Sequence, residues 1–262
     1  MLKPFAILDT DFISKLYSTR NAADTPFLEK LFDFDYDFCC HEQILFELKK
    51  HDKSSINWLL SKSDKVKIYS DTAIIEMLKS FSLPESVACR YYISHLKSSC
   101  EIYEQNYFEN CYGNLIGKIH SLPDFLRQIE TGDDLIGTHH NLGEVKNTLL
   151  LKVLYLCTKN TVYKFCSDDQ DTRSHILAYA AQNKYDLKCI SPFSFFFLAK
   201  NELALSKEIC DDYFSSWISQ SSNQRVSVIE RNGLKKTHLT AEVYSDIWND
   251  SVDCTAEGYI KY

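Results

Sequence analysis

The stretch FAILDTDFI, residues 5–13, decides the fold that the sequence predicts. Its first four residues form a short apolar run, which is typical of a buried strand, and the run ends at Asp9. Thr10 and Asp11 follow, and either can cap the amphipathic segment that begins there and continues to Tyr17. We therefore expect a strand, a turn and a helix, with Asp9 at the carboxyl end of the strand.

The same alternation of strand and helix recurs along the chain. We expect further strands at 36–40, 66–69, 161–166 and 187–190, and helices at 42–51, 141–156, 172–183 and 192–205. Strands that alternate with helices in this way predict a mainly parallel sheet with helices on both faces. The expected fold class is α/β, a three-layer α/β/α sandwich.

Two regions lie outside this alternation. Residues 71–137 are rich in helix-compatible residues, and we interpret them as a mainly helical insertion. After residue 200, Asn232-Gly233 stands between two extended runs, which predicts a hairpin. We therefore expect a domain over residues 1–200, which contains the insertion, and a C-terminal extension over 201–262.

The composition is that of an ordinary globular protein. Of the 262 residues, 45% are hydrophobic and 25% are charged, and there are only 7 Gly and 5 Pro, which argues against a loop-rich design or a β-sandwich. The net charge of −7 counts against a protein that coats nucleic acid with a basic face. It counts less against a nuclease, because carboxylates that bind metal contribute to the negative sum.

Cysteine usage and the N-terminus bear on location. Ten cysteines occur without any CxxC pair, so structural zinc is poorly supported. The opening residues MLKPFAILDTDF lack the pattern of a secretory signal peptide, and no segment approaches the roughly 20 apolar residues of a membrane span. We expect a cytoplasmic protein with reduced thiols and no membrane partner.

Acidic residues recur where an open parallel sheet collects ligands, beyond the carboxyl ends of its strands. Asp9 follows the first strand, and Asp168 and Asp169 follow the strand at 161–166. Glu144 lies in the first turn of a helix that should face the same edge, and Glu47 lies on the helix after the second strand. Such carboxylates repel one another unless a cation joins them, and hard oxygen ligands suit Mg²⁺ or Mn²⁺. These ions activate water and stabilise charge on a phosphoryl oxygen, as phosphodiester hydrolysis requires.

Each of these residues also has a structural interpretation. Asp9 can be a helix cap, and Glu144 is favoured in a first helical turn by the helix dipole. Glu47 on an amphipathic helix is most often a solvent-facing residue. The segment 168–171 can supply capping and turn chemistry alone. The prediction rests on their conjunction at matching points of the topology.

Four segments resemble the motifs of PIN domains. They are FAILDTDFI at 5–13, HEQILFEL at 41–48, LGE at 142–144 and FCSDDQD at 165–171. The resemblance covers roughly residues 3–69 and 138–200. It implies a PIN-like, metal-dependent endoribonuclease with a Mg²⁺ or Mn²⁺ cofactor and an RNA substrate, and it leaves DNA open. It also implies a toxin-like or defence-associated role, with a cognate inhibitor protein as a partner.

The resemblance carries residue roles onto this chain motif by motif. It implies a catalytic, metal-binding set made of Asp9, Glu47, Glu144 and Asp169. Asp168 competes with Asp169 for the last place. Supporting roles fall to Thr10, to Asp11, which stands where Ser or Asn is commoner, to Ser167, which would orient the last aspartate, and to Asp171, whose position varies in the family.

Some features stay open. His139 and His140 precede Glu144 in a polar segment, which is either an ordinary loop or a contact for a substrate phosphate. The gap between Glu47 and Glu144 is longer than in compact PIN toxins, so the insertion would shape the path of the substrate. Three roles are open for the extension after residue 200: a dimerisation element, a partner-binding module or a specificity arm. The first of these would make the protein a homodimer.

Two other functions compete with the nuclease. A degenerate PIN-like scaffold would keep the sheet and lose the metal, although a scaffold has no use for a repulsive cluster of carboxylates. A phosphohydrolase acting on DNA or small nucleotides would use the same chemistry. The sequence contains no GxSxG motif, so a serine hydrolase is not supported. It also contains no P-loop or GxGxxG motif, so nucleotide binding by a glycine-rich loop is not supported.

Overall fold

The structure is a computed structural model that describes residues 3–51, 53–104, 106–113, 121–136, 141–158, 162–220, 225–230, 233–251 and 253–255. The elements run β1 (Phe5–Leu8), α1 (Thr10–Ser18), the 3-10 helix η1 (Phe27–Asp33), β2 (Asp37–His41), α2 (Gln43–His51), α3 (Lys53–Ser61), β3 (Val66–Tyr69), α4 (Asp71–Lys79), α5 (Glu85–Tyr103), α6 (Tyr107–Cys111), α7 (Leu122–Ile136), α8 (Leu142–Cys157), β4 (Val162–Cys166), α9 (Gln170–Asn183), β5 (Asp186–Ile190), α10 (Pro192–Leu203), α11 (Lys207–Gln220), β6 (Arg225–Glu230), β7 (Gly233–His238), α12 (Ala241–Trp248) and β8 (Asp253–Thr255).

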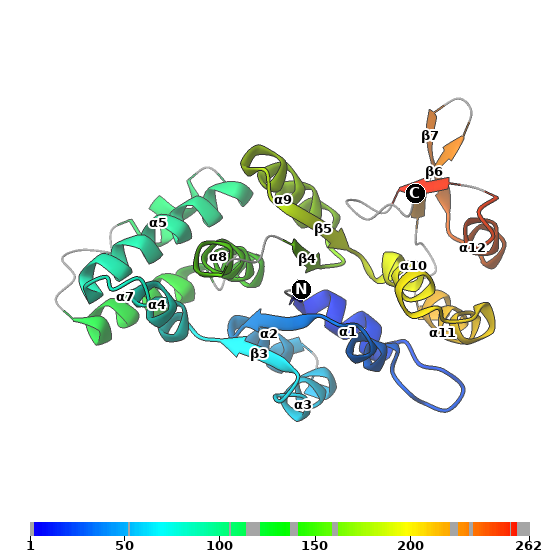
Figure 1. Cartoon of the computed structure of the whole chain (residues 1–262), viewed down its shortest axis with the longest axis horizontal. Helices are drawn as coiled ribbons and strands as arrows, with labels where there is room; N and C mark the ends of the chain where they lie inside the picture. The colour runs from blue at the N-terminus through cyan, green and yellow to red at the C-terminus, as the bar shows by residue number, and fades with distance from the viewer. Residues whose placement is uncertain are drawn as a thin grey trace.

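Five parallel strands form the central sheet in the order β3-β2-β1-β4-β5 (Figure 1). Leu8 at the end of β1 lies opposite Cys166 at the end of β4, and His41 at the end of β2 lies opposite Tyr69 at the end of β3. The carboxyl ends of the strands therefore meet along one edge. The predicted α/β class with a parallel sheet is confirmed.

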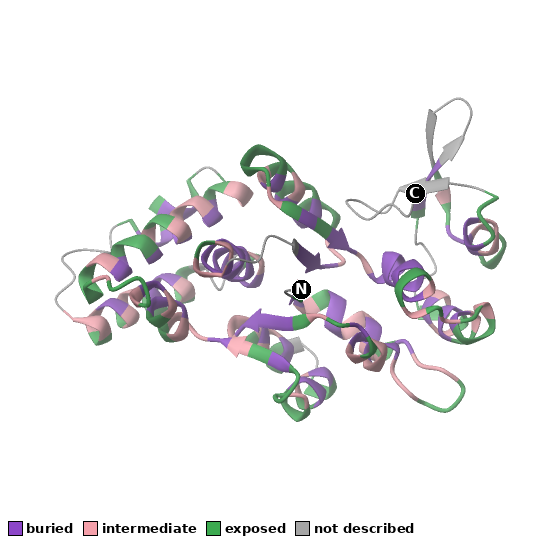
Figure 2. Ribbon diagram, viewed as in Figure 1, coloured by how far each residue is buried: buried purple, intermediate pink, exposed green. Residues whose placement is uncertain are grey.

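Alternate residues of each strand enter two separate buried cores, because successive side chains point to opposite faces of a sheet. In β1, Ala6 and Leu8 join the core formed with α1, η1, α10 and α11, whereas Ile7 joins the core formed with α4, α5, α8 and α9. Figure 2 shows the buried residues concentrated in the strands and in α8 and α10. The three layers follow from this alternation.

The helices α4 to α7 lie between β3 and α8 in the chain and at one end of the molecule in space (Figure 1). Helix α8 stands between them and the sheet, and nearly every residue from Leu142 to Leu154 is buried. A helix buried on all sides is held by its neighbours rather than by solvent. Its polar buried residues therefore need partners from other elements.

The chain after residue 203 continues on the opposite side of the sheet. Strands β6, β7 and β8 form a small antiparallel sheet in the order β7-β6-β8, which confirms the predicted hairpin. Val226, Val228 and Tyr244 join the core of α10 and α11, and the rings of Tyr244 and Phe214 stack with centroids 3.9 Å apart. This region is thus tied to the central domain by aromatic packing.

Most predicted elements agree with the structure to within two residues, and β1 and β3 agree in full. The elements that the sequence pattern did not reveal are η1, α3 and β8. Helix α3 carries only four apolar residues among nine, so its periodicity is weak. The nine cysteines whose side chains the structure describes are all free thiols. None of the described helices is both long and apolar enough to span a membrane.

Candidate functional site

The site begins where β1 and β4 end side by side. Asp9 follows β1, and its backbone N–H donates to the carbonyl of Cys166 at 3.0 Å, which extends the strand pairing by one residue. The Asp9 side chain is 2% exposed, and the buried Ser167 hydroxyl donates a hydrogen bond to its carboxylate. Asp9 occupies the N-cap position of α1 but makes no side-chain cap bond. The capping interpretation of Asp9 is therefore wrong.

Glu47 joins three helices at this edge. Its Oε2 accepts the Thr10 hydroxyl of α1 at 2.6 Å, and its Oε1 accepts the Gly143 N–H of α8 at 2.9 Å. A Cβ atom at position 143 would lie 2.5 Å from Oε2 of Glu47, so glycine is required for this close approach. Glu47 is thus held inside the site, and the solvent-facing interpretation of it is wrong.

Glu144 lies in the first turn of α8 and faces the same space. Burial, together with the charges of Glu47 and Asp169, raises the pKa of the Glu144 carboxyl to about 7. Burial, and then the charges of Glu144 and Glu47, raise the pKa of the Asp9 carboxyl well above its usual value. The charge of Asp11 acts on both groups in the same direction. These mutual effects show that the structure brings the predicted carboxylates together.

We use the name acidic rim for Asp9, Glu47, Glu144 and Asp169. Within the described part of the chain, none of these four carboxylates forms an ion pair. Buried charges are ordinarily paired or neutralised, because water no longer solvates them. The acidic rim therefore holds more negative charge than its surroundings compensate.

The two aspartates after β4 differ in their partners. Asp168 forms an ion pair with Lys15 of α1. Asp169 caps α9, since its Oδ1 accepts the Thr172 N–H at 2.9 Å, and its charge acts on Glu144. Asp169, rather than Asp168, thus belongs to the uncompensated set. Asp171 is exposed in the first turn of α9, and no contact joins it to the acidic rim within the described residues.

Sequence reasoning missed two residues at this edge. Tyr103, at the end of α5, donates its hydroxyl to the Glu144 carbonyl at 3.4 Å and lies 2.9 Å from the Thr148 hydroxyl. Asn147 donates to the Leu8 carbonyl at 3.1 Å and accepts the N–H of His41. Neither stood out, because the helical insertion was the least readable part of the chain and Asn147 carries no motif. His139 and His140 lie outside the described residues.

A second polar cluster lies further along the same edge. We use the name lysine network for Lys146, Asp71, Asp133, His41 and Tyr92. The Lys146 ammonium, fully buried, lies 2.9 Å from an oxygen of each of the two aspartates. Burial raises the pKa of the Asp71 carboxyl, but Lys146, His41 and Tyr92 together outweigh burial and hold that pKa below its usual value. This cluster, unlike the acidic rim, contains its own countercharge.

Among the described residues, the side chains with metal-ligand spacing overlap the lysine network and do not belong to the acidic rim. Within the described residues, His41, Glu42 and Asp71 are the set of three ligand side chains whose ligand atoms all lie within 4.8 Å of one another. His41 has no nitrogen to spare, because Nδ1 accepts the Gln43 N–H at 3.1 Å and Nε2 lies 2.9 Å from Asp71. A metal would have to displace at least one of these two bonds. The carboxylates of the acidic rim, which repel one another, would have to draw closer to share an ion.

A cavity of about 780 Å³ opens beside the lysine network. Five of its lining residues are acidic, namely Glu42, Asp71, Glu130, Asp133 and Asp134. Such a lining disfavours phosphate groups.

No protein-family model matches the chain, and neither curated proteins nor solved structures give a significant match to it. A proposal for the function therefore has to rest on the acidic rim and on the motifs of the sequence.

Proposed function

We propose that the chain is a PIN-like, divalent-metal-dependent nuclease that hydrolyses phosphodiester bonds in RNA. The observation that carries the proposal is the acidic rim, in which the buried Asp9 faces Glu144 and Glu47 without a countercharge in the described chain. Oxygen-only donors of this kind fit Mg²⁺ or Mn²⁺. A bound cation would relieve the repulsion that raises the pKa values of Asp9 and Glu144.

Each side chain has a distinct task in this proposal. Asp9, Glu144 and Asp169 would hold the cation, which supplies Lewis acidity for a phosphoryl oxygen and lowers the pKa of water. Ser167 orients the Asp9 carboxylate through its hydrogen bond. Glu47 fixes α1 against α8, so that the ligands from both helices face one another. Because Glu144 titrates near pH 7, cation binding displaces a proton from it and becomes tighter as the pH rises.

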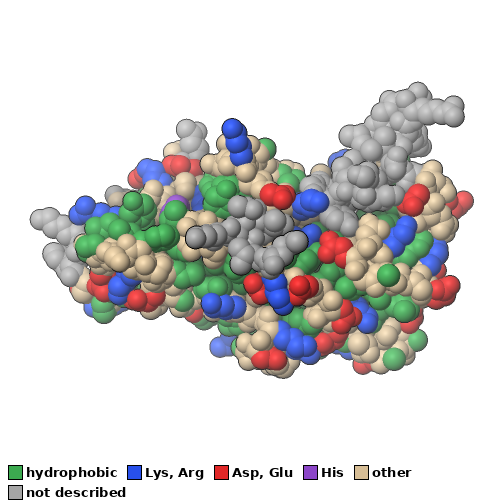
Figure 3. Space-filling view, viewed as in Figure 1, with side chains coloured by type: hydrophobic (Ala, Val, Ile, Leu, Met, Phe, Trp, Pro, Cys, Tyr) green, Lys and Arg blue, Asp and Glu red, His purple; other side chains and the backbone are tan. Residues whose placement is uncertain are grey.

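RNA is proposed as the substrate on the resemblance to PIN domains, and DNA is the closest competitor. On the face shown in Figure 3, Lys and Arg side chains are interspersed with Asp and Glu and form no continuous basic surface. Phosphate neutralisation by a basic coat is therefore not the support for this proposal. The toxin-like role, the inhibitor partner and the cytoplasmic location remain predictions from the sequence.

The test compares the wild type with Asp9→Asn and Glu144→Gln on labelled single-stranded RNA, single-stranded DNA and free nucleotides. Each substrate is incubated with Mn²⁺, with Mg²⁺ and with EDTA. We expect the wild type to cut RNA with either metal, and both variants to lose about 100-fold or more of the rate. The matched control is Asp171→Asn, which removes an exposed acid near the site and should retain the rate.

Each competing function predicts a different result. Equal cleavage by the wild type and Asp9→Asn places the chemistry elsewhere. RNA binding without cleavage under every metal condition indicates a degenerate scaffold. Turnover of free nucleotides without cleavage of RNA identifies a small-molecule phosphohydrolase.

A further inference from the structure

The lysine network connects the helical insertion to α8. Lys146 lies on α8, and its Nζ lies 2.9 Å from Asp71 of α4, 2.9 Å from Asp133 of α7 and 3.1 Å from the Tyr92 hydroxyl of α5. Tyr92 in turn donates its hydroxyl to Asp71. Three helices of the insertion therefore hold one side chain of α8.

The same network continues to α2, the helix that carries Glu47. His41, at the end of β2, lies with Nε2 at 2.9 Å from Oδ1 of Asp71. Its Nδ1 accepts the N–H of Gln43, which is the first residue of α2. Because Nδ1 accepts, the proton is on Nε2 and is donated to Asp71. The start of α2 and the start of α8 are thus fixed to the same aspartate.

The first turns of α8 are held from every side. Residues two apart on a helix differ by about 200° in direction, so Glu144 faces the acidic rim while Lys146 faces the insertion. Asn147 bonds to both β1 and β2, and Gly143 donates its N–H to Glu47. A rotation or slip of α8 would therefore break contacts with the insertion, the sheet and α2 together.

We propose that Lys146 is a positioning residue, which sets the rotation of α8 so that Gly143 meets Glu47 and Glu144 faces Asp9. A buried ion pair adds little net stability compared with apolar residues of similar volume, but it fixes geometry. The helical insertion then holds the acidic rim in place, because it fixes α8 through Lys146. The part of this inference that concerns metal binding rests on the proposed nuclease function.

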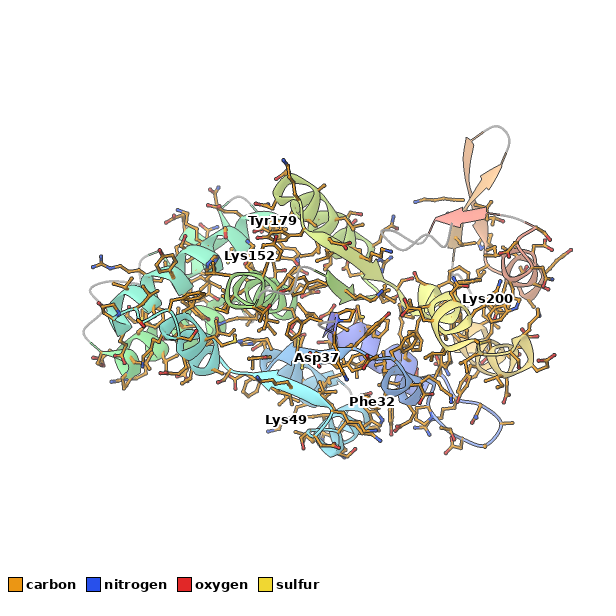
Figure 4. All side chains as sticks on the ribbon, viewed as in Figure 1. Phe32, Asp37, Lys49, Lys152, Tyr179 and Lys200 are labelled. Carbon is orange, nitrogen blue, oxygen red and sulfur yellow. The ribbon has the colours of Figure 1, made fainter. Side chains whose placement is uncertain are left out.

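The test compares Lys146→Met with Lys152→Met. Both remove a buried lysine from the same helix, but Lys152 lies beside Tyr179 (Figure 4), with its ammonium 4.4 Å from that ring. Its contacts within the described residues, with Ser98 and Tyr179, do not include the lysine network. The probe is Mn²⁺ alone, titrated by calorimetry and by electron paramagnetic resonance. We expect the dissociation constant to rise about tenfold or more in Lys146→Met and to stay within twofold in Lys152→Met.

A second measurement does not depend on metal. Amide hydrogen exchange, followed without Mn²⁺, should become about tenfold faster at Gly143 in Lys146→Met, relative to the amides of residues 149–154 in the same helix. Uniform acceleration along α8 would indicate a purely structural role and overturn the proposal. Tyr92→Phe removes one hydroxyl and keeps the ring, so it decides the outcome by the same two readouts if Lys146→Met does not fold.

The two proposals fail in different ways. If the wild type does not bind Mn²⁺ but Gly143 exchange still depends on Lys146, the nuclease proposal fails and the positioning role stands. If Mn²⁺ binds and depends on Asp9, yet Lys146→Met and Tyr92→Phe leave both affinity and Gly143 exchange unchanged, the positioning role fails alone.

Discussion

At the scale of single residues, the adjacent aspartates after β4 differ because their partners differ. Asp168 is paired with Lys15, whereas Asp169 caps α9 and its charge helps to raise the pKa of Glu144. We predict that Asp169→Asn, which keeps the cap, weakens Mn²⁺ binding about tenfold or more. Asp168→Asn loses only a partly exposed ion pair, worth about 0–1 kcal/mol, and should bind Mn²⁺ normally. Calorimetric titration measures both, and the opposite ranking would assign the ligand role to Asp168.

Gly143 gives a second prediction at this scale. The methyl group of Gly143→Ala would meet the Glu47 carboxylate, which is the movable end of a flexible side chain. The fold should therefore persist, because alanine favours a helix over glycine by up to about 1 kcal/mol, while Glu47 moves away from Thr10. We expect cleavage and Mn²⁺ affinity to fall while the melting temperature changes by only a few degrees. Unchanged cleavage and Mn²⁺ affinity in Gly143→Ala would contradict the role given to Glu47.

A site residue could be predicted from the sequence only where the order of strands and helices determines its position. Asp9 and Asp169 follow strands of a parallel sheet, so their convergence could be expected from the order of the elements. Lys146 could not be recognised, because its partners Asp71 and Asp133 are 75 and 13 residues away and each is compatible with a solvated surface position. Tyr103 was likewise hidden, since its contact depends on how α5 packs on α8.

At the scale of elements, α8 is the helix whose sequence and environment disagree most. It buries Lys152, whose Nζ donates to the Ser98 hydroxyl at 2.9 Å and has no carboxylate partner within the described residues. Burial lowers the pKa of Lys152 to about 7. A folded-state pKa below the unfolded value means that the unfolded chain binds the proton more tightly, so folding is opposed below about pH 10.5 and most strongly below pH 7.

We predict that Lys152→Met stabilises the protein. Methionine fills a similar volume and removes the proton that opposes folding. The melting temperature should rise at pH 7, by about 2–4 °C for each kcal/mol gained, and the gain should shrink as the pH approaches 10. Thermal melts of wild type and variant across that range measure the effect. A variant that is no more stable than the wild type at pH 7 would show that Lys152 has an unrecognised favourable partner.

Elements were predictable where local pattern and tertiary environment agree. The strands of the sheet are short apolar runs, and burial on both faces maintains such runs. Helix α3 (KSSINWLLS) and η1 pack only part of their surface on α1 and α2, so their patterns are weaker. The insertion was recognised as helical, but its interaction with α8 through charged side chains has no local signature.

At the scale of the whole molecule, two buried groups on α8 make stability depend on pH in opposite directions. The folded-state pKa of Glu144 is raised to about 7, so its contribution is complete below pH 4.5 and is lost as the pH rises to 7. Asp9 and Asp133, with raised pKa values, act in the same direction, and His95, with a lowered pKa, opposes them. The contribution of Lys152 is lost instead as the pH falls from about 10.5 to 7.

The metal-free protein should therefore be least stable near pH 7. Each fully linked proton changes the free energy of unfolding by about 1.4 kcal/mol per pH unit, so melting temperatures in EDTA should fall from pH 5 to 7 and rise again to pH 9. Glu144→Gln should reduce the fall in melting temperature between pH 5 and 7, and Lys152→Met should reduce the rise between pH 7 and 9. Mn²⁺ should stabilise the wild type more at pH 8 than at pH 5, because its ligands must lose their protons. A melting temperature that changes monotonically with pH, and that neither variant alters, would contradict the pKa shifts given to Glu144 and Lys152. A minimum near pH 7 without any stabilisation by Mn²⁺ would support those pKa shifts and contradict the proposed metal site.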